Sequence, residues 1–436
     1  MTSTTWRFPR AFWTANAVEL CERAAYYAVF IAITIYLTNV VGYDDIWAAW
    51  IGGIFSAGLY LLPTFTGAAA DRMGFRNAII LAFALLSIGY FALGFLPYKT
   101  TVPPAIVILM LGGSFIKSII TGTVAKTTDA VNRARAYSIF YGIVNVGSFT
   151  GKTFAYPLRI SLGLVWVNYF AAAMTLIALI VVVFFYRSAA VGGEAKSVRE
   201  AWQGLVRVVT NPRLVTLILI VTGFWIIQHQ LYATMPKYVL RTVGNHAAPE
   251  WIANVNPLVV VLSVVLITQL MRRAKALTSM SVGMLLMPFS ALCMASSPIL
   301  TAVTGESVSI AGVVALHPIT VMMIVGIVFQ GLAECFISPR YLEFFSLQSP
   351  KGEEGLYLGF AHLHSFLASL LGFGISGYLL NAYCPDPRTL TADQALHAYD
   401  RAYVIWYYFA VIGLIAAAAL IMYGRVTRRR DTAAVG

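Results

Sequence analysis

Apolar stretches long enough to cross a lipid bilayer recur along the whole chain. A membrane-spanning helix needs about 20 consecutive apolar residues. The sequence predicts twelve such helices, at residues 12–39, 46–70, 77–97, 103–126, 135–157, 160–186, 213–240, 252–271, 277–296, 309–345, 356–381 and 401–424. These runs are too long and too continuous for the alternating strands of about ten residues that build an outer-membrane barrel. We therefore predict an all-α membrane protein with twelve transmembrane helices.

The longest polar connection divides these helices into two sets of six. It runs from Arg187 to Arg213 and contains Gly192, Gly193 and several charges. We predict an N-terminal six-helix bundle at 1–187, a cytoplasmic linker at 188–212 and a C-terminal six-helix bundle at 213–436. Within the linker, residues 198–209 have the pattern of a short amphipathic helix on a membrane surface. Matched basic loops after the second and eighth helices suggest two parallel repeats with the site between them.

Composition and charge position support a membrane protein. The 436 residues are 59% hydrophobic and only 11% charged, against about 25% charged in soluble domains. The net charge of +12 is not a nucleic-acid signature, because the basic residues cluster at one set of helix ends. This bias predicts that both termini face the cytoplasm and that the partner is the lipid bilayer. The opposite loops carry the acidic residues Asp44, Asp45, Glu250, Glu306, Asp386 and Asp393.

Three charges lie close together inside the first apolar stretch. Glu19, Glu22 and Arg23 are spaced three and four residues apart, so they share one helical face. A charge at mid-membrane depth costs roughly 2.5–3.5 kcal/mol by insertion scales. The three charges must therefore be paired, face a watery cavity or be neutralised by protons. They predict a path for protons or charged solutes, with a buried structural ion network as the alternative.

A lysine in the fourth predicted helix extends this set. Lys117 follows Gly112 and Gly113 in a mostly apolar span, and a lone ammonium there needs a carboxylate. Glu19 or Glu22 is the expected partner. Burial disfavours an ionised carboxylate and a nearby cation favours it, so a small movement can change proton occupancy. Proton coupling through Glu19, Glu22, Arg23 and Lys117 is the preferred interpretation, and a static ion pair is the alternative.

Several separated motifs resemble known transporters. The loop from Gly67 to Arg76 is similar to the signature of the major facilitator superfamily. Within that superfamily, the chain resembles the proton-dependent oligopeptide transporter family. The matching segments are Glu19-x-x-Glu22-Arg23 with Tyr26-Tyr27, Gly112 to Lys117, Phe140 to Phe149, Phe224 to Gln230, Asn256-Pro257 and Ala333 to Pro339.

The resemblance implies a fold, a function and a site. The implied fold is the major facilitator fold, with two pseudo-symmetric six-helix bundles. The implied function is proton-coupled symport, importing di- or tripeptides or similar small zwitterions by alternating access. Glu334 would receive the substrate's amino group, although it could instead only fix helix packing. The other implied substrate-binding residues are Arg23, Tyr26, Tyr27, Tyr60, Lys117, Asn145, His229, Gln230 and Asn256, and the implied gating residues are Gly67, Asp71, Arg72, Gly74 and Arg76.

Departures from the family pattern leave the substrate open. The family's second arginine, seven positions after Arg23, is Phe30 here, and its acidic partner corresponds to His229. Ala24 follows Arg23 at the position where the family motif has an aromatic residue. Transport of another small anion or metabolite with the same fold is therefore the alternative.

Other classes of function fit the sequence less well. Its four cysteines show no paired spacing, which predicts no metal site and no cofactor besides the coupling proton. No nucleophile–base set indicates an enzyme. A non-transporting scaffold would have no reason to carry the buried charges. We expect a monomer in a bacterial inner membrane.

Overall fold

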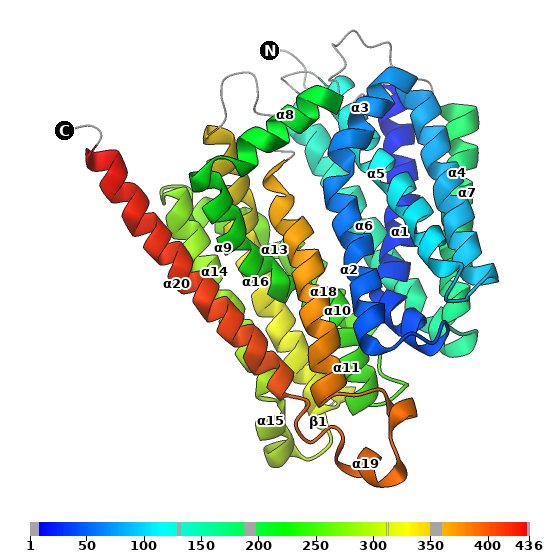
Figure 1. Ribbon diagram of the computed structural model, residues 1–436, viewed down its shortest axis with the longest axis vertical. Coiled ribbons are helices and arrows are strands. Elements are labelled where there is room, and N and C mark those ends of the chain that lie inside the picture. Colours follow the sequence, from blue (N-terminus) through cyan, green and yellow to red (C-terminus); the bar gives the residue numbers. More distant parts are fainter. Residues whose placement is uncertain are drawn as a thin grey trace. The chain divides into compact units, whose positions relative to one another are not determined.

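The computed structural model describes residues 8–128, 132–186, 198–310, 312, 314–348 and 360–433. Nearly all of them lie in helices (Figure 1). By packing, the chain forms two compact units. Unit 1 comprises Met1–Tyr43 and Gly58–Gln203, and unit 2 comprises Asp44–Ala57 and Gly204–Gly436.

Unit 1 is built around its first helix. Its elements are α1 (Arg10–Asn39), the end of α2 (Asp45–Leu61), α3 (Pro63–Met73), α4 (Phe75–Phe95), α5 (Val102–Lys126), α6 (Arg133–Ser161) and α7 (Leu164–Phe185). Helix α1 packs against α5, α6 and α7, and α4 packs against α5 and α7. Most of the apolar part of α1 is buried. A charged residue on α1 is therefore held inside the unit rather than against lipid.

Unit 2 contains the first part of α2 and the C-terminal half of the chain. Its helices are α9 (Pro212–Gln228), α10 (Gln230–Ala233), α11 (Met235–Thr242), α12 (Pro249–Ile252), α13 (Val255–Leu270), α14 (Ala276–Ala295), α15 (Ser297–Thr304), α16 (Pro318–Leu347), α18 (Leu363–Tyr383), α19 (Ala392–His397) and α20 (Val404–Ala433). Helix α14 packs on α16 and α20, and α9 packs on α18 and α20. A short 3-10 helix, η1 (Pro387–Thr389), precedes α19.

The membrane helices agree largely with the predicted ones. In the described residues, ten helices are long and apolar enough to span a membrane, and α2 with α3, bent by 51°, gives an eleventh if the pair is counted as one span. The bend lies at Pro63, which opens α3. The predicted fifth span corresponds to the 29-residue α6. It is less apolar than the ten helices and is not among them, so the prediction of twelve spans is not fully confirmed.

Two predicted spans are interrupted. Residues 213–240 form α9, α10 and α11, with breaks at His229 and Thr234. The predicted span at 309–345 begins instead with a hairpin of β1 (Val308–Ile310) and β2 (Val314–Leu316), and its helix starts at Pro318. The hairpin turns at Gly312, whose φ of 70° favours glycine. The apolar composition of the two stretches did not indicate where the chain turns.

The segment between the two sets of membrane helices contains the predicted amphipathic helix. Helix α8 covers Val198–Val209, the range expected from the sequence. Trp202, Val206 and Val209 are exposed on it at the spacing of a single helical face. Its contact with a membrane surface remains a prediction.

Two glycines bring α6 against the charged turn of α1. A Cβ atom built at Gly147 would lie 2.6 Å from the Arg23 Cβ, and one at Gly151 would lie 2.2 Å from the Ala24 carbonyl oxygen. Only a residue without a side chain permits this approach, as at many membrane helix interfaces. The close packing excludes lipid from the face of α1 that carries Arg23.

We predict that Gly151→Ala separates α1 from α6. The substitution should lower the thermal unfolding midpoint of the purified protein, with a loss of about 1–3 kcal/mol typical of overpacking. Gly142→Ala is the matched control, because a Cβ at Gly142 on the same helix meets nothing within 4 Å. An unchanged midpoint in Gly151→Ala would contradict the close approach.

Candidate transport site

The charged turn of α1 forms a compact ion cluster. The Arg23 Nε lies 3.2 Å from the Glu19 Oε1, and the Arg23 guanidinium also donates to the Glu22 Oε2. Glu19 and Glu22 are only 4% and 2% exposed. The predicted grouping of these three side chains is therefore present, and Arg23 is shared between both carboxylates.

The charges within this cluster do not balance. On α1 itself, two carboxylates face one guanidinium, and the buried Glu19 Oε2 accepts no hydrogen bond in the part of the chain that the structure describes. Lys117 of α5 is a further cation whose charge acts on both carboxylates, although it forms no ion pair with either among the described residues. A buried ionised oxygen without a donor is costly. Adding one proton removes the excess negative charge and turns that oxygen from an acceptor without a partner into a group that can donate.

Lys117 differs from its expected role as a partner of these carboxylates. Its Nζ donates to the Leu59 carbonyl oxygen over 3.4 Å and lies 4.1 Å from the centroid of the Tyr60 ring. The described ion pairs include none between Lys117 and Glu19 or Glu22. The expected pairing is wrong for this structure, because Arg23 already occupies both carboxylates. The close contact of Gly113 with Leu59 brings α5 to the end of α2, where the Tyr60 ring contacts Lys117.

Aromatic residues surround the cations of unit 1. The Arg23 guanidinium lies 5.4 Å from the Tyr26 ring centroid, and Tyr26 stacks on Phe30 at 5.0 Å. The Phe30 ring thus packs where the resemblance would place an arginine. Lys152, which is fully buried on α6, lies 5.5 Å from the Tyr27 ring. It was not among the predicted site residues, although a lysine in the middle of a membrane helix is a signal that could have identified it.

Asn145 is the remaining predicted substrate-binding residue of unit 1, and it bonds to the backbone of its own helix. Asn145 donates to the Tyr141 carbonyl oxygen one turn before it on α6, over 2.8 Å. This bond leaves the side-chain oxygen of Asn145 available as an acceptor.

In unit 2, Glu334 of α16 is held by two amides. The Gln228 Nε2 donates to the Glu334 Oε2 over 3.0 Å, and the Asn256 Nδ2 does so over 3.5 Å. The structure therefore brings the predicted Glu334 and Asn256 together. Gln228 was not among the predicted site residues, although it lies in the motif segment from Phe224 to Gln230.

The next two predicted residues behave as packing groups. Gln230 is fully buried, and its Nε2 donates to the Ile226 and Gly372 carbonyl oxygens. Its Oε1 accepts from the Thr234 hydroxyl over 2.6 Å. These bonds join α10 to α18. The buried His229 has its Nε2 3.4 Å from the Ser369 Oγ.

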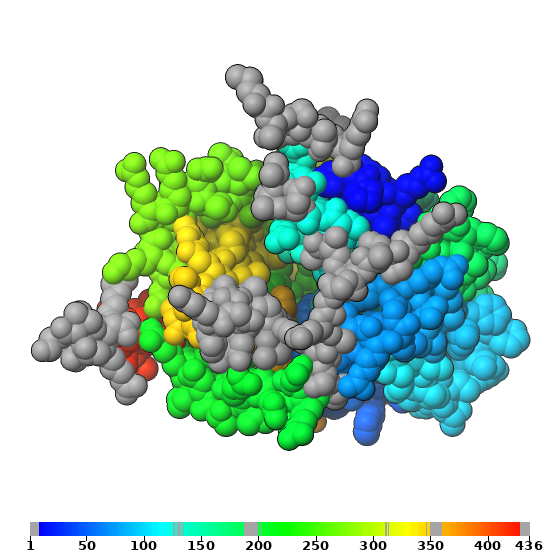
Figure 2. All heavy atoms as spheres, turned by 90° about the horizontal axis from the view of Figure 1, so that it is seen from above, coloured from blue at the N-terminus to red at the C-terminus, as the bar shows by residue number. Residues whose placement is uncertain are grey.

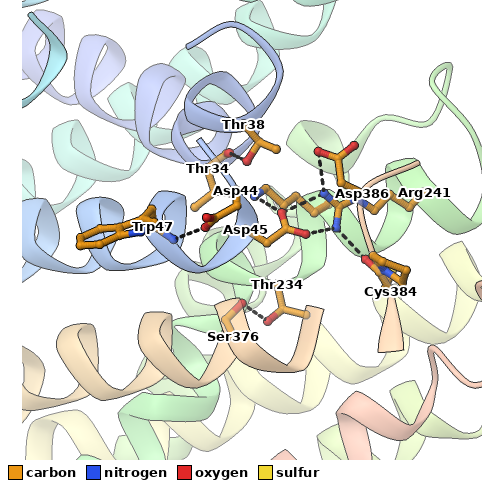
Figure 3. Close-up of polar contacts among 12 residues, drawn as sticks. Thr34, Thr38, Asp44, Asp45, Trp47, Thr234, Arg241, Ser376, Cys384 and Asp386 are labelled. Atoms are coloured by element: carbon orange, nitrogen blue, oxygen red, sulfur yellow. Dashed lines mark hydrogen bonds and ion pairs between the residues drawn. The ribbon is translucent and has the colours of Figure 1, made fainter. Parts of the chain in front are cut away.

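A second charged cluster lies at the end of unit 2 where α2 begins (Figure 3). The buried Asp45 carboxylate accepts from the Lys237 Nζ over 2.7 Å and from both terminal nitrogens of Arg241 over 2.7 and 2.9 Å. Arg241 also donates to the Cys384 carbonyl oxygen over 2.6 Å. These contacts fix the start of α2 to α11 and to the end of α18, and the sequence analysis had used Asp45 only as a topology marker.

Asp386 extends this cluster toward the surface. It lies 3.9 Å from Arg241 and binds the Arg388 side chain in the loop after α18. Burial would raise the pKa of Asp386, but hydrogen bonds from Arg388 and the charge of Arg241 outweigh it, so its pKa lies below the usual value. The carboxylate therefore remains charged at mildly acidic pH.

The predicted gating segment forms the turn between α3 and α4. Gly74 has a φ of 80° and lies between Met73, which ends α3, and Phe75, which begins α4. Arg76 donates to the Val183 and Tyr186 carbonyl oxygens over 3.0 and 3.3 Å, at the end of α7. Asp71 and Arg72 are exposed. A Cβ at Gly67 would lie 3.3 Å from the Ser118 Oγ, so this glycine permits close approach of α3 to α5.

Comparison with known proteins identifies the family. The sequence profile of the Major Facilitator Superfamily matches residues 17–316. The chain belongs to this superfamily. It is therefore a membrane transporter and not an enzyme.

This superfamily member has relatives named for drug resistance. It is 24% identical over 404 residues to the multidrug resistance protein MdtH of Photorhabdus laumondii, covering 91% of this chain and 90% of the relative. It is 25% identical over 424 residues to MdtH of Yersinia pestis, covering 94% and 93%.

Solved structures share its fold. The POT family transporter PepTSo has a TM-score of 0.74 at 18% identity, covering 98% of this chain and 99% of that one. An auto-inhibited POT family peptide transporter has a TM-score of 0.73 at 19% identity, covering 96% and 97%. A POT family transporter in complex with 5-aminolevulinic acid has a TM-score of 0.72 at 16% identity, covering 95% and 96%. The major facilitator fold expected from the sequence is thus confirmed, and it is the fold of the family whose motifs the sequence resembles.

We predict that Asp45→Asn destabilises this transporter. The change leaves Lys237 and Arg241 with less compensating negative charge in a buried place, a loss of about 3 kcal/mol for a broken buried ion pair. The thermal unfolding midpoint should fall, and Lys237→Met in the Asp45→Asn background should recover part of it.

The exposed Asp393 on α19 provides the control for this series. Asp393→Asn removes the same charge without leaving buried cations, so it should leave the midpoint unchanged. Equal midpoints for Asp45→Asn and the wild type would show that the cluster contributes no stability.

Proposed function

We propose that this transporter is a proton-coupled symporter that imports di- or tripeptides or similar small zwitterions by alternating access. The observation that carries the proposal is the charge imbalance on α1. Glu19 and Glu22 share Arg23, and the buried Glu19 Oε2 accepts no hydrogen bond within the described residues. A proton relieves this imbalance, and its loss restores it. The energy of the cluster therefore depends on proton occupancy, as coupling to a proton gradient requires.

The partners of Lys117 support a role in binding carboxylate. Its bond to the Leu59 carbonyl is long, at 3.4 Å, and the Tyr60 ring supplies only a cation–π contact. Both are weaker partners than a carboxylate would be. Lys117 can therefore exchange them for the carboxylate end of a substrate at modest cost.

Glu334 provides the opposite charge for a zwitterion. The amide groups of Gln228 and Asn256 hold its carboxylate in place. Removing water from both charged ends of a zwitterion is favourable only when each end gains a partner of opposite charge. The similar folds include peptide transporters and one that holds 5-aminolevulinic acid, which itself carries an amino group and a carboxyl group. We assign the amino end of the substrate to Glu334 and its carboxylate end to Lys117 and Arg23.

Two observations favour other substrates. Phe30 stands where the resemblance predicts an arginine, so transport of another small anion or metabolite is the alternative within the same fold. The relatives named MdtH favour a second function, proton-driven drug export.

Transport into proteoliposomes with the pH gradient imposed in either direction separates these functions. Peptide accumulation along the inward proton gradient supports import, whereas drug extrusion without peptide competition supports export.

We predict that Glu22→Gln uncouples transport from the proton gradient. The neutral amide retains hydrogen bonding to Arg23 but cannot cycle a proton. Gradient-driven uptake of dialanine into proteoliposomes should fall to background, while counterflow exchange should persist.

Glu306→Gln is the control for this experiment, because it removes an exposed carboxylate outside the cluster. It should retain both activities. Undiminished gradient-driven uptake in Glu22→Gln would rule out its role in coupling.

We predict that Glu334→Gln removes recognition of the substrate's amino group. Competition should weaken for dialanine by about 1.5–3 kcal/mol, the value of a hydrogen bond to a charged group. N-acetyl-dialanine, which has no ammonium group, should bind equally to the wild type and the variant.

The control variant is Glu343→Gln on the same helix, which removes an exposed carboxylate paired with Arg340. It should leave both affinities unchanged. Equal losses for dialanine and N-acetyl-dialanine in Glu334→Gln would instead indicate that Glu334 only maintains helix packing.

A further inference from the structure

A groove between α9 and α20 in unit 2 lies outside every residue assigned to transport. It has a volume of about 460 Å³ and is lined by Pro212, Arg213, Thr216, Ile220, Ala419, Met422, Tyr423, Val426 and Thr427. Both helices are long and apolar enough to span a membrane. Figure 2 views the molecule from above, at the end where α9 begins; green marks the region of α8 and α9, and only a small part of α20 is visible in red.

The charged residue that lines the groove lies at one end of it, and apolar residues line the other end. Arg213 and Thr427 line it near the start of α9 and the end of α20, while Ile220 and Ala419 lie further along. At 1.5 Å per residue, the separation of Arg213 from Ile220 corresponds to roughly 10 Å along α9. Such a gradient suits a molecule with a charged head and a hydrocarbon tail.

The outer wall of the groove faces an apolar environment. Met422 and Val426 are 65% and 46% exposed although both are hydrophobic. On a membrane span, such exposed apolar side chains are contacted by lipid rather than by water. An occupant can therefore enter this groove from the bilayer.

The charge of the groove selects the sign of the head group. Its nine lining residues, all within the described part of the chain, include the cation Arg213 and no carboxylate. The exposed Arg425 adjoins Val426 on α20. The charge bias of the sequence predicts that this end of the helices faces the cytoplasm, where anionic lipids attract basic residues. Arg213 can pair with a phosphate through its planar guanidinium.

We propose that this groove binds a phospholipid with an anionic head group, with the head group at Arg213 and an acyl chain along Ile220, Ala419 and Met422. The bound lipid contacts both α9 and α20. These helices are already joined here by a hydrogen bond of 3.1 Å from the Tyr423 hydroxyl to the Arg213 carbonyl oxygen. The lipid therefore stabilises the contact of α20 with α9.

Lipid retention and thermal stability test this site together. Delipidated protein in detergent is supplied with phosphatidylglycerol or phosphatidylcholine of identical acyl chains. Retained lipid is measured by native mass spectrometry, and the unfolding midpoint is measured in parallel. The wild type should retain several-fold more phosphatidylglycerol than phosphatidylcholine, and phosphatidylglycerol should raise its midpoint more.

Three variants separate the head-group contact from the acyl-chain contact. Arg213→Gln should abolish the preference for phosphatidylglycerol, and Arg213→Lys should retain much of it. Ala419→Phe fills the groove and should reduce retention of both lipids. The control Arg273→Gln removes an exposed arginine between α13 and α14, outside the groove, and should behave as the wild type.

Several results would overturn the proposal. One is a wild-type lipid preference in Arg213→Gln, and another is an equal loss in Arg273→Gln, which would indicate diffuse surface charge. A midpoint shift reproduced by inorganic phosphate alone would identify a phosphate site instead of a lipid site. A change of oligomeric state in Ala419→Phe with unchanged lipid retention would indicate that a second copy of the chain covers the groove.

Discussion

The sharing of one guanidinium between two buried carboxylates on α1 is the constraint on which the rest of unit 1 depends. Glu19, Glu22 and Arg23 occupy little more than one helical turn of α1, a helix that packs against α5, α6 and α7. Gly147 and Gly151 allow α6 to approach closely enough to exclude lipid from this face. Because lipid is excluded and both carboxylates are buried, their negative charge must be balanced by neighbouring cations or by a proton.

The charged clusters of the two units differ in how completely their charges are paired. In the cluster at the start of α2, Asp45 accepts from Lys237 and Arg241. Asp386 is the second carboxylate near Arg241, so two cations face two carboxylates. This cluster is suited to hold structure in place. On α1 the balance is incomplete, and Lys117 rests on a carbonyl oxygen and an aromatic ring. An incompletely balanced cluster is suited to exchange protons and ligands.

The sequence predicted the helices well because burial in a membrane requires long apolar runs. It also located α8, whose amphipathic pattern is local to Val198–Val209. It did not reveal the breaks at His229 and Thr234 or the hairpin before Pro318, since an apolar run contains no record of where the chain turns. The contacts between side chains on different helices were predicted less well than the helices. Spacing on one helix grouped Glu19, Glu22 and Arg23 correctly, whereas the partners of Lys117, Asp45 and Glu334 lie on other helices and depend on packing that no spacing encodes.

The central claim is that protons move with the substrate. Its most direct test is proton movement measured with a pH-sensitive dye enclosed in proteoliposomes, when an inward gradient of a transported peptide is applied without any initial pH difference. The account predicts that the lumen acidifies as the peptide enters and that a protonophore abolishes the acidification. Peptide entry at a constant internal pH would contradict it.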